Sequence, residues 1–383
     1  MRSFIPALGG LRALAALAVY AEHAAAMGIA PSPISGTYLG ECGVMLFFAL
    51  SGFLMADLYL RQQPSMFSVA TFARARFARI YPLFALTIIG SAVIYRIDQT
   101  FPFQMSGLVA LQHLLLLGDG LTLWTISVEF QFYATFIVLW LLYGMLRVGH
   151  RDGLFALICT SLILLLWLAG FPGFGVERIA LTHFAQFFLI GVLGALASWH
   201  LPRDASRWAD WALPIVVGLL GLAVLLLWFA NERGCYRQPG FLTLTGFIVF
   251  FAAISNGFFS RCLGCRLLVY LGEISFGVYL LHRPMIYLWS KLGLTFPEYF
   301  AFPLVTLLVI GVSYLAYRLI EVPAREFITL RRHGFQQQVS ALPRTRDGGL
   351  SSELEPTQAS IFSTNQVALN APIVRTQSDR PLS

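Results

Sequence analysis

Runs of about 20 apolar residues, separated by short polar segments, recur along most of this 383-residue chain. A helix of that length crosses the roughly 30 Å hydrocarbon core of a bilayer. Inside a bilayer the backbone has to satisfy its own hydrogen bonds, so these runs are expected to be helical. Only 12% of the residues are charged, against roughly 25% in soluble domains. The sequence therefore predicts an all-α protein, a polytopic transmembrane helical bundle.

The hydropathy pattern predicts about ten spans. They cover residues 8–27, 40–60, 80–97, 122–146, 153–170, 179–199, 211–230, 240–258, 267–290 and 300–320. A shorter apolar piece, Gly107–Gly118, cannot cross and is expected to lie at an interface or to re-enter. With the N-terminus inside, the cytoplasmic loops hold ten arginines, whereas the opposite loops hold four arginines and Lys291. The positive-inside rule therefore predicts that both termini lie in the cytoplasm.

One domain boundary is predicted, near residue 333. Residues 1–332 hold all the spans and form the predicted membrane domain, whereas residues 333–383 are rich in Ser, Gln and Pro. That composition cannot bury a core, so a disordered cytoplasmic tail is expected. The net charge of +7 comes from arginines placed between apolar runs, which indicates membrane topology and not nucleic-acid binding. Cys262 and Cys265 form one isolated CxxC, so no metal site is predicted.

The first predicted span carries three ionisable groups within LRALAALAVYAEHA, residues 11–24. They are Arg12, Glu22 and His23. At 100° and 1.5 Å per residue, the eleven steps from Arg12 to His23 place both on one helix face, about 16 Å apart along the axis. Separately, Arg12 can snorkel to the interface, and His23 can form an interhelical hydrogen bond or face the outer boundary. The shared face favours a functional site.

Two later spans also carry ionisable groups. Glu129 lies in WTISVEFQFY, residues 124–133, where a carboxylate is rare unless it is paired or faces a wet cavity. The alternative is an interfacial Glu within an aromatic belt. His282 and Arg283 lie in LGEISFGVYLLHRPMI, residues 271–286. Because successive spans alternate in direction, we expect His23, Glu129 and His282 to share one level in the outer half of the membrane, as an acid/base site requires.

The predicted cytoplasmic side carries a different chemistry. RARFARIYPLF, residues 74–84, places Arg76 and Arg79 on one side of a helix. These arginines are either topological anchors that meet anionic lipid head groups, or guanidinium forks for a phosphate-rich cytosolic ligand. The last span ends in SYLAYRLIEVPAREF, residues 313–327, which adds Glu321.

Six motifs, found in order between residue 1 and about residue 327, resemble the acyltransferase 3 family of integral-membrane O-acyltransferases. They are LRALAALAVYAEHA, LFFALSGFLM, RFARIYPLF, WTISVEFQFY, LGEISFGVYLLHRP and YRLIEVPAR. Most members of this family O-acetylate bacterial surface polysaccharides. The resemblance implies a protein of the bacterial inner membrane that binds acyl-CoA, with acetyl-CoA as a co-substrate and no bound cofactor. It also implies a glycan or lipid-linked saccharide as the acceptor.

The resemblance assigns roles to several residues. His23 takes the family's catalytic histidine role, with Arg12 as its partner in handling the donor. Arg76 and Arg79 take the role of the RxxR motif that is associated with the acyl donor. A neutral imidazole can deprotonate a sugar hydroxyl, and Glu22 or Glu129 is expected to orient it, as the acid does in other triads. The supporting residues in this interpretation are Glu22, His282, Arg283 and Glu321.

Two other expectations accompany the resemblance. Some family members carry a fused extracytoplasmic hydrolase-like domain, whereas the polar tail takes its place here, which favours lipid-linked or polymeric glycans over peptidoglycan as the acceptor. The competing function is a multi-span transporter in which Arg12, His23, Glu129 and His282 form an ion pathway. Transporters of that kind are built from inverted repeats with paired broken helices, and this sequence shows neither pattern.

Overall fold

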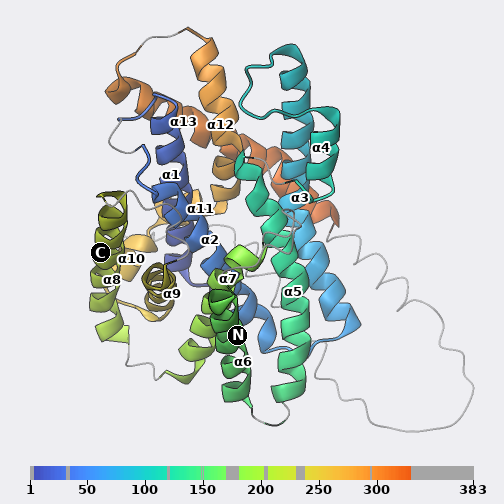
Figure 1. The fold of residues 1–383 in the computed structure, drawn as a ribbon, viewed down its shortest axis with the longest axis vertical. Coiled ribbons are helices and arrows are strands. Elements are labelled where there is room, and N and C mark those ends of the chain that lie inside the picture. Colours follow the sequence, from blue (N-terminus) through green and yellow to red (C-terminus); the bar gives the residue numbers. More distant parts are fainter. Residues whose placement is uncertain are drawn as a thin grey trace, which may run out of the picture. The chain divides into compact units, whose positions relative to one another are not determined.

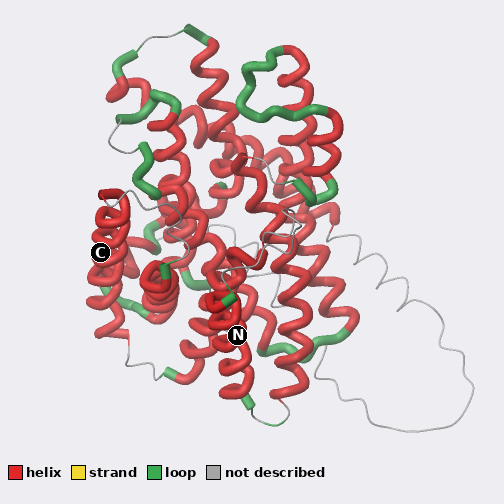
Figure 2. Tube along the Cα trace, viewed as in Figure 1, coloured by secondary structure: helices red, strands yellow, loops and turns green. Residues whose placement is uncertain are grey.

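The computed structural model describes residues 4–31, 35–118, 121–147, 149, 151–169, 181–201, 206–229, 238–293 and 296–328, and the regular elements among them are helices (Figure 2). The predicted tail, residues 333–383, lies outside the described residues. The helices run in the order α1 (Pro6–Ala26), α2 (Leu39–Met55), η2 (Ala56–Leu60), α3 (Met66–Ile97), α4 (Gly107–Leu114), η3 (Leu121–Leu123), α5 (Trp124–Arg147), α6 (Asp152–Leu168), α7 (Leu181–His200), α8 (Ser206–Phe229), α9 (Pro239–Ile254), α10 (Phe258–Leu263), α11 (Arg266–Glu273), α12 (Ser275–Lys291), α13 (Glu298–Ala316) and η6 (Tyr317–Glu321).

The all-α class is confirmed, and each of the ten predicted spans falls on a helical segment (Figure 1). Six helices of the described part are long and apolar enough to cross a membrane. They are Leu39–Leu60, Met66–Ile97, Trp124–Arg147, Leu181–His200, Trp208–Leu226 and Glu298–Ile328. The chain is therefore an integral membrane protein, whereas the count of ten spans and the cytoplasmic placement of both termini stay predictions.

Helix α3 begins fourteen residues before the predicted span at residue 80. Its start is set by a capping box, in which Ser65 Oγ accepts a hydrogen bond from Ser68 N and Ser68 Oγ accepts one from Ser65 N. Hydropathy does not predict this part of the helix, because a segment with several arginines is typical of a loop between spans. As a result Arg76 and Arg79 lie inside a 32-residue helix and not at its start.

The predicted span 267–290 is two helices, α11 and α12, which meet at Ile274. The Ser275 hydroxyl donates to the carbonyl oxygen of Gly272 at 2.8 Å, and such side-chain bonds compete with the helical ladder. Gly272 itself packs so closely on the backbone of Gly9 in α1 that a Cβ atom would have no room. The break thus divides the predicted span into two helices that both pack on α1.

The core is built on close contacts between helix backbones. Helix α1 packs on α2, α11 and α12, and α2 packs on α7. At the α2–α7 crossing, a Cβ at Gly52 would collide with the carbonyl of Phe188, and one at Gly191 would collide with the carbonyl of Ala49. Small residues at such crossings are what permits tight packing of membrane helices. Helices α1 and α12 are neighbours in this packing, and the site lies where they meet α2, α5 and α7.

Candidate active site

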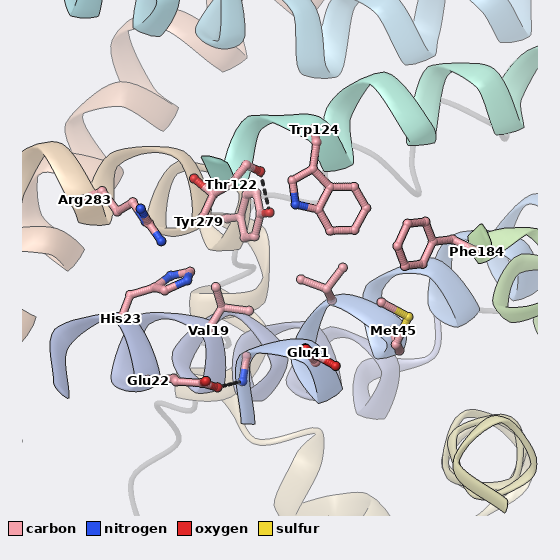
Figure 3. Close-up of a pocket in the computed structure, with 12 residues that line it drawn as sticks. Val19, Glu22, His23, Glu41, Met45, Thr122, Trp124, Phe184, Tyr279 and Arg283 are labelled. Carbon is pink, nitrogen blue, oxygen red and sulfur yellow. Dashed lines mark hydrogen bonds between the residues drawn. The ribbon is translucent and has the colours of Figure 1, made fainter. Parts of the chain in front are cut away.

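A pocket of about 380 Å³, which we call the histidine pocket, opens where α1, α2, α7 and α12 meet the start of α5. Its walls include His23 of α1, Trp124 of α5, Phe184 of α7, and Tyr279 and Arg283 of α12 (Figure 3). The His23 and Arg283 side chains lie next to each other at one end of the pocket, and Phe184 lies at the other. The pocket therefore has a polar end and an aromatic end.

His23 and His282 form a hydrogen-bonded pair at the polar end. His23 Nδ1 lies 2.9 Å from His282 Nε2, and the two rings are parallel within 2°. His282 is fully buried, and its Nδ1 lies 3.1 Å from the carbonyl oxygen of Val278, which can only accept. A neutral His282 therefore donates through Nδ1 and accepts from His23 through Nε2. This leaves the lone pair of His23 on Nε2, which is the form a general base needs.

Glu22 does not orient His23, contrary to the sequence-based expectation. Its Oε2 atom accepts a hydrogen bond from the backbone N–H of Gly40, in the first turn of α2. The carboxylate therefore satisfies one of the open donors at the start of that helix. Glu22 joins α1 to α2 and shapes the wall of the histidine pocket, whereas His282 occupies the orienting position.

A second group of polar side chains lies along α1, about 16 Å from His23 by the rise per residue. We call it the arginine cluster, and its members are Arg12, Arg76, Arg79 and Arg325, which are half-buried and whose charges interact. Glu129 belongs to this group, since its charge interacts with that of Arg12. Its Oε1 atom accepts hydrogen bonds from Ser51 at 3.2 Å and from Tyr133 at 2.5 Å.

The expectation that Glu129 shares a level with His23 and His282 is therefore wrong for Glu129. The direction of α5 was anticipated, but α5 begins at Trp124, which is itself at the histidine pocket. Five residues further on, Glu129 is about 7.5 Å deeper along the helix. Of the three groups, only the two histidines meet.

Two π-helical turns border the arginine cluster, and such turns recur at functional sites. In η2, the Tyr59 hydroxyl accepts a hydrogen bond from Arg76 at 3.4 Å. In η6, the buried Glu321 accepts one from Arg325 at 2.7 Å. Arg325 was not among the predicted site residues. Its spacing of four from Glu321 on the last helix is the signal that would have indicated the pair.

The arginine cluster holds more positive than negative charge. Its four guanidinium groups face two carboxylates, Glu129 and Glu321, an excess of two positive charges. The buried Nε of Arg76 has no hydrogen-bond partner among the described residues. Guanidinium forks of this kind bind phosphate groups, so the cluster is suited to a phosphorylated ligand.

Three residues of the histidine pocket were missed by searching for ionisable groups. Tyr279 donates to the carbonyl of Thr122 at 2.7 Å and accepts from the Thr125 hydroxyl at 2.8 Å, which fixes the start of α5 against α12. Trp124 and Phe184 pack together with ring centroids 4.7 Å apart. Aromatic side chains are mostly core residues in a membrane protein, so nothing in their spacing separates these three from the rest.

Comparison with known proteins indicates the family of the chain as a whole. The family described as an acyltransferase domain matches residues 5–318. Acyltransferase MdmB of Streptomyces mycarofaciens is 36% identical over 151 residues, which are 34% of this chain and 38% of MdmB. No solved structure matches.

Two relatives match over most of this chain. O-acetyltransferase OatA of Staphylococcus aureus is 24% identical over 361 residues, covering 84% of this chain and 57% of OatA. Peptidoglycan O-acetyltransferase OatA of Listeria monocytogenes is 25% identical over 365 residues, covering 85% of this chain and 56% of that protein. The chain thus spans little more than half the length of these relatives.

Proposed function

Because this chain belongs to the acyltransferase 3 family, we propose that it is a membrane O-acetyltransferase of the bacterial inner membrane. It transfers an acyl group from acyl-CoA to a hydroxyl of a glycan or lipid-linked saccharide. The two OatA relatives are O-acetyltransferases, which supports the reaction, and the peptidoglycan acceptor of one of them supports a glycan. The six long apolar helices support the membrane setting.

The observation that carries the proposal is the hydrogen-bonded pair of His23 and His282 at the wall of an open pocket. Acyl transfer to a hydroxyl needs a base that removes the hydroxyl proton as the oxygen attacks. His282 holds His23 in the tautomer that has its lone pair on Nε2, the role that a carboxylate fulfils in other triads. The aromatic faces of Trp124 and Phe184 offer an apolar surface on which a sugar ring can lie.

The arginine cluster is the proposed site for the phosphates of acyl-CoA. Its excess of two positive charges supports this assignment, as does the buried Nε of Arg76, which has no hydrogen-bond partner in the described part of the chain. Arg12 and His23 lie on one helix, about 16 Å apart, which is compatible with a pantetheine arm that extends from the phosphates toward the base. We expect membrane lipids to surround the apolar outer faces of the long helices.

Purified protein in proteoliposomes tests the proposal. The wild type, supplied with acetyl-CoA outside and a saccharide acceptor inside or outside, should release CoA and form an O-acetylated product that mass spectrometry detects. His23→Ala should retain only a residual rate, about 10²–10⁴-fold below that of the wild type, while it remains folded and still binds acetyl-CoA. The transporter alternative predicts ion or solute flux across the same vesicles without CoA release, and that result would overturn the proposal.

A further inference from the structure

Within the described part of the chain, Arg283 differs from the half-buried arginines of the arginine cluster in having no carboxylate that interacts with it. Arg12 interacts with Glu129, and Arg325 binds Glu321, whereas no carboxylate among the described residues interacts with Arg283. It is half-buried, and its Nε is fully buried with no hydrogen-bond partner in the described part of the chain. A desolvated guanidinium without a counter-charge is costly, which points to a negative charge that arrives with the reaction or with a ligand.

The position of Arg283 indicates which charge that is. It directly follows His282 on α12, and its guanidinium lies next to the His23 ring at the polar end of the histidine pocket (Figure 3). Glu22, the nearest carboxylate in sequence to His23, is bound to the start of α2. A general base and a cation without a carboxylate partner among the described residues are therefore adjacent in one pocket. An acyl carbonyl that reacts beside His23 also meets Arg283.

We propose that Arg283 is a catalytic residue that binds the oxyanion of the tetrahedral intermediate; this rests on the proposed function. His23 Nε2 takes the proton of the acceptor hydroxyl, and the hydroxyl oxygen forms a bond to the carbonyl carbon of the acyl thioester. The π electrons of the C=O bond move to its oxygen, which Arg283 binds. When the C=O bond re-forms, the C–S bond breaks, and the CoA thiolate takes the proton from His23. Donors placed for developing charge are among the largest contributions to catalysis.

Arg283→Gln and Arg283→Lys in proteoliposomes test this role. With Gln, the kcat for acyl transfer should fall about 10²–10³-fold, the typical effect of removing an oxyanion donor, with both KM values unchanged. The slow hydrolysis of acetyl-CoA without acceptor should fall by the same factor, because water passes through the same intermediate. Lys should restore part of the loss. Arg96→Gln, at an exposed arginine near the end of α3, is the matched control and should be unchanged.

The opposite result would be a rise in acceptor KM with the hydrolysis rate unchanged. That outcome means that Arg283 grips an acidic group of the saccharide, and it overturns the oxyanion role. If Gln fails to fold, the Lys variant decides, since it keeps the charge but loses the planar fork. An inactive wild type would instead contradict the proposed function itself, so the two failures are separable.

Discussion

His23 and His282 lie 259 residues apart in sequence, yet their rings are parallel with centroids 5.1 Å apart and share one hydrogen bond. The bond depends on the break at Ile274, because α12 begins there and carries His282 two turns further on. Val278, whose carbonyl fixes the His282 tautomer, lies one turn before it on the same helix. The geometry of the base is thus built into the first two turns of α12.

The first prediction is that His282→Ala lowers kcat about 10²–10⁴-fold, because His23 is no longer held in the required tautomer. The KM for acetyl-CoA should not change, since His282 does not line the pocket. His282→Gln can place an amide oxygen near the lost Nε2 and should recover part of the rate. Steady-state kinetics in proteoliposomes measure both effects.

A double variant separates this positioning role from a structural one. If His282 acts through His23, His23→Ala with His282→Ala should be no less active than His23→Ala alone. Additive losses, or a melting temperature that falls in step with the rate, would mean that His282 only supports the fold.

The second prediction concerns the arginine cluster. Arg76→Gln and Arg79→Gln should each raise the Kd for CoA about 10–100-fold, since a hydrogen bond to a charged group contributes about 1.5–3 kcal/mol. Glu129→Gln should not weaken binding, because it removes a negative charge that competes with the phosphates and keeps an oxygen for Tyr133. Isothermal titration of the purified protein reads out both results.

Arg74→Gln is the matched control, because Arg74 lies on the same helix but is exposed. Equal loss of CoA binding in the Arg74, Arg76 and Arg79 variants would show that binding depends on the overall positive charge of α3. It would contradict a specific phosphate-binding site.

How far the sequence predicts this molecule depends on the kind of information needed. The length of the apolar runs located the helices, because bilayer thickness sets the length of a membrane-spanning helix. It missed the first fourteen residues of α3, where a capping box starts the helix and partly buried arginines interrupt the apolar run. The alternating direction of the predicted spans placed His23 and His282 at one level, and in the structure they are in contact. It placed Glu129 wrongly, because direction does not supply the depth at which α5 begins.

A third prediction addresses the α2–α7 crossing. Gly191→Ala should lower the free energy of unfolding by about 1–3 kcal/mol, because the added Cβ meets the carbonyl of Ala49 and forces the backbones apart. Gly90→Ala on α3 is the control, since no atom lies within 4 Å of the Cβ that it adds. It should be neutral or slightly stabilising. Thermal unfolding in detergent compares the two, and equal effects would contradict the tight crossing.

The fourth prediction is a pH dependence at the junction of α3 and α12. Lys291 Nζ lies 2.5 Å from Asp98 Oδ2, and the Lys291 contact, with those of Thr100 and Tyr287, holds the pKa of Asp98 well below its usual range. A depressed pKa means that the stabilisation is complete above the unfolded pKa of about 3.9 and is lost as the pH falls below it. Asp98→Asn should therefore be less stable than the wild type at pH 7.

The gap in melting temperature between the wild type and Asp98→Asn should narrow as the pH is lowered from 5 to 3. Lys291→Met, like Asp98→Asn, should lower the melting temperature at pH 7. A gap that stays constant with pH would show that the Asp98 charge has no part in joining the two helix ends.

The last prediction tests the direction of α5, which joins the two sites. Trp124 at its start borders the histidine pocket, and Arg147 at its end lies beside Arg61 in the predicted cytoplasmic loops. With the native cysteines replaced, Glu41→Cys at the pocket should react with a membrane-impermeant thiol reagent added outside. Gly149→Cys, just after α5, should react only when the reagent reaches the cytoplasm. Labelling of both from the same side would mean that α5 does not cross the membrane, and the proposed division between a cytoplasmic donor site and an outer acceptor site would fail.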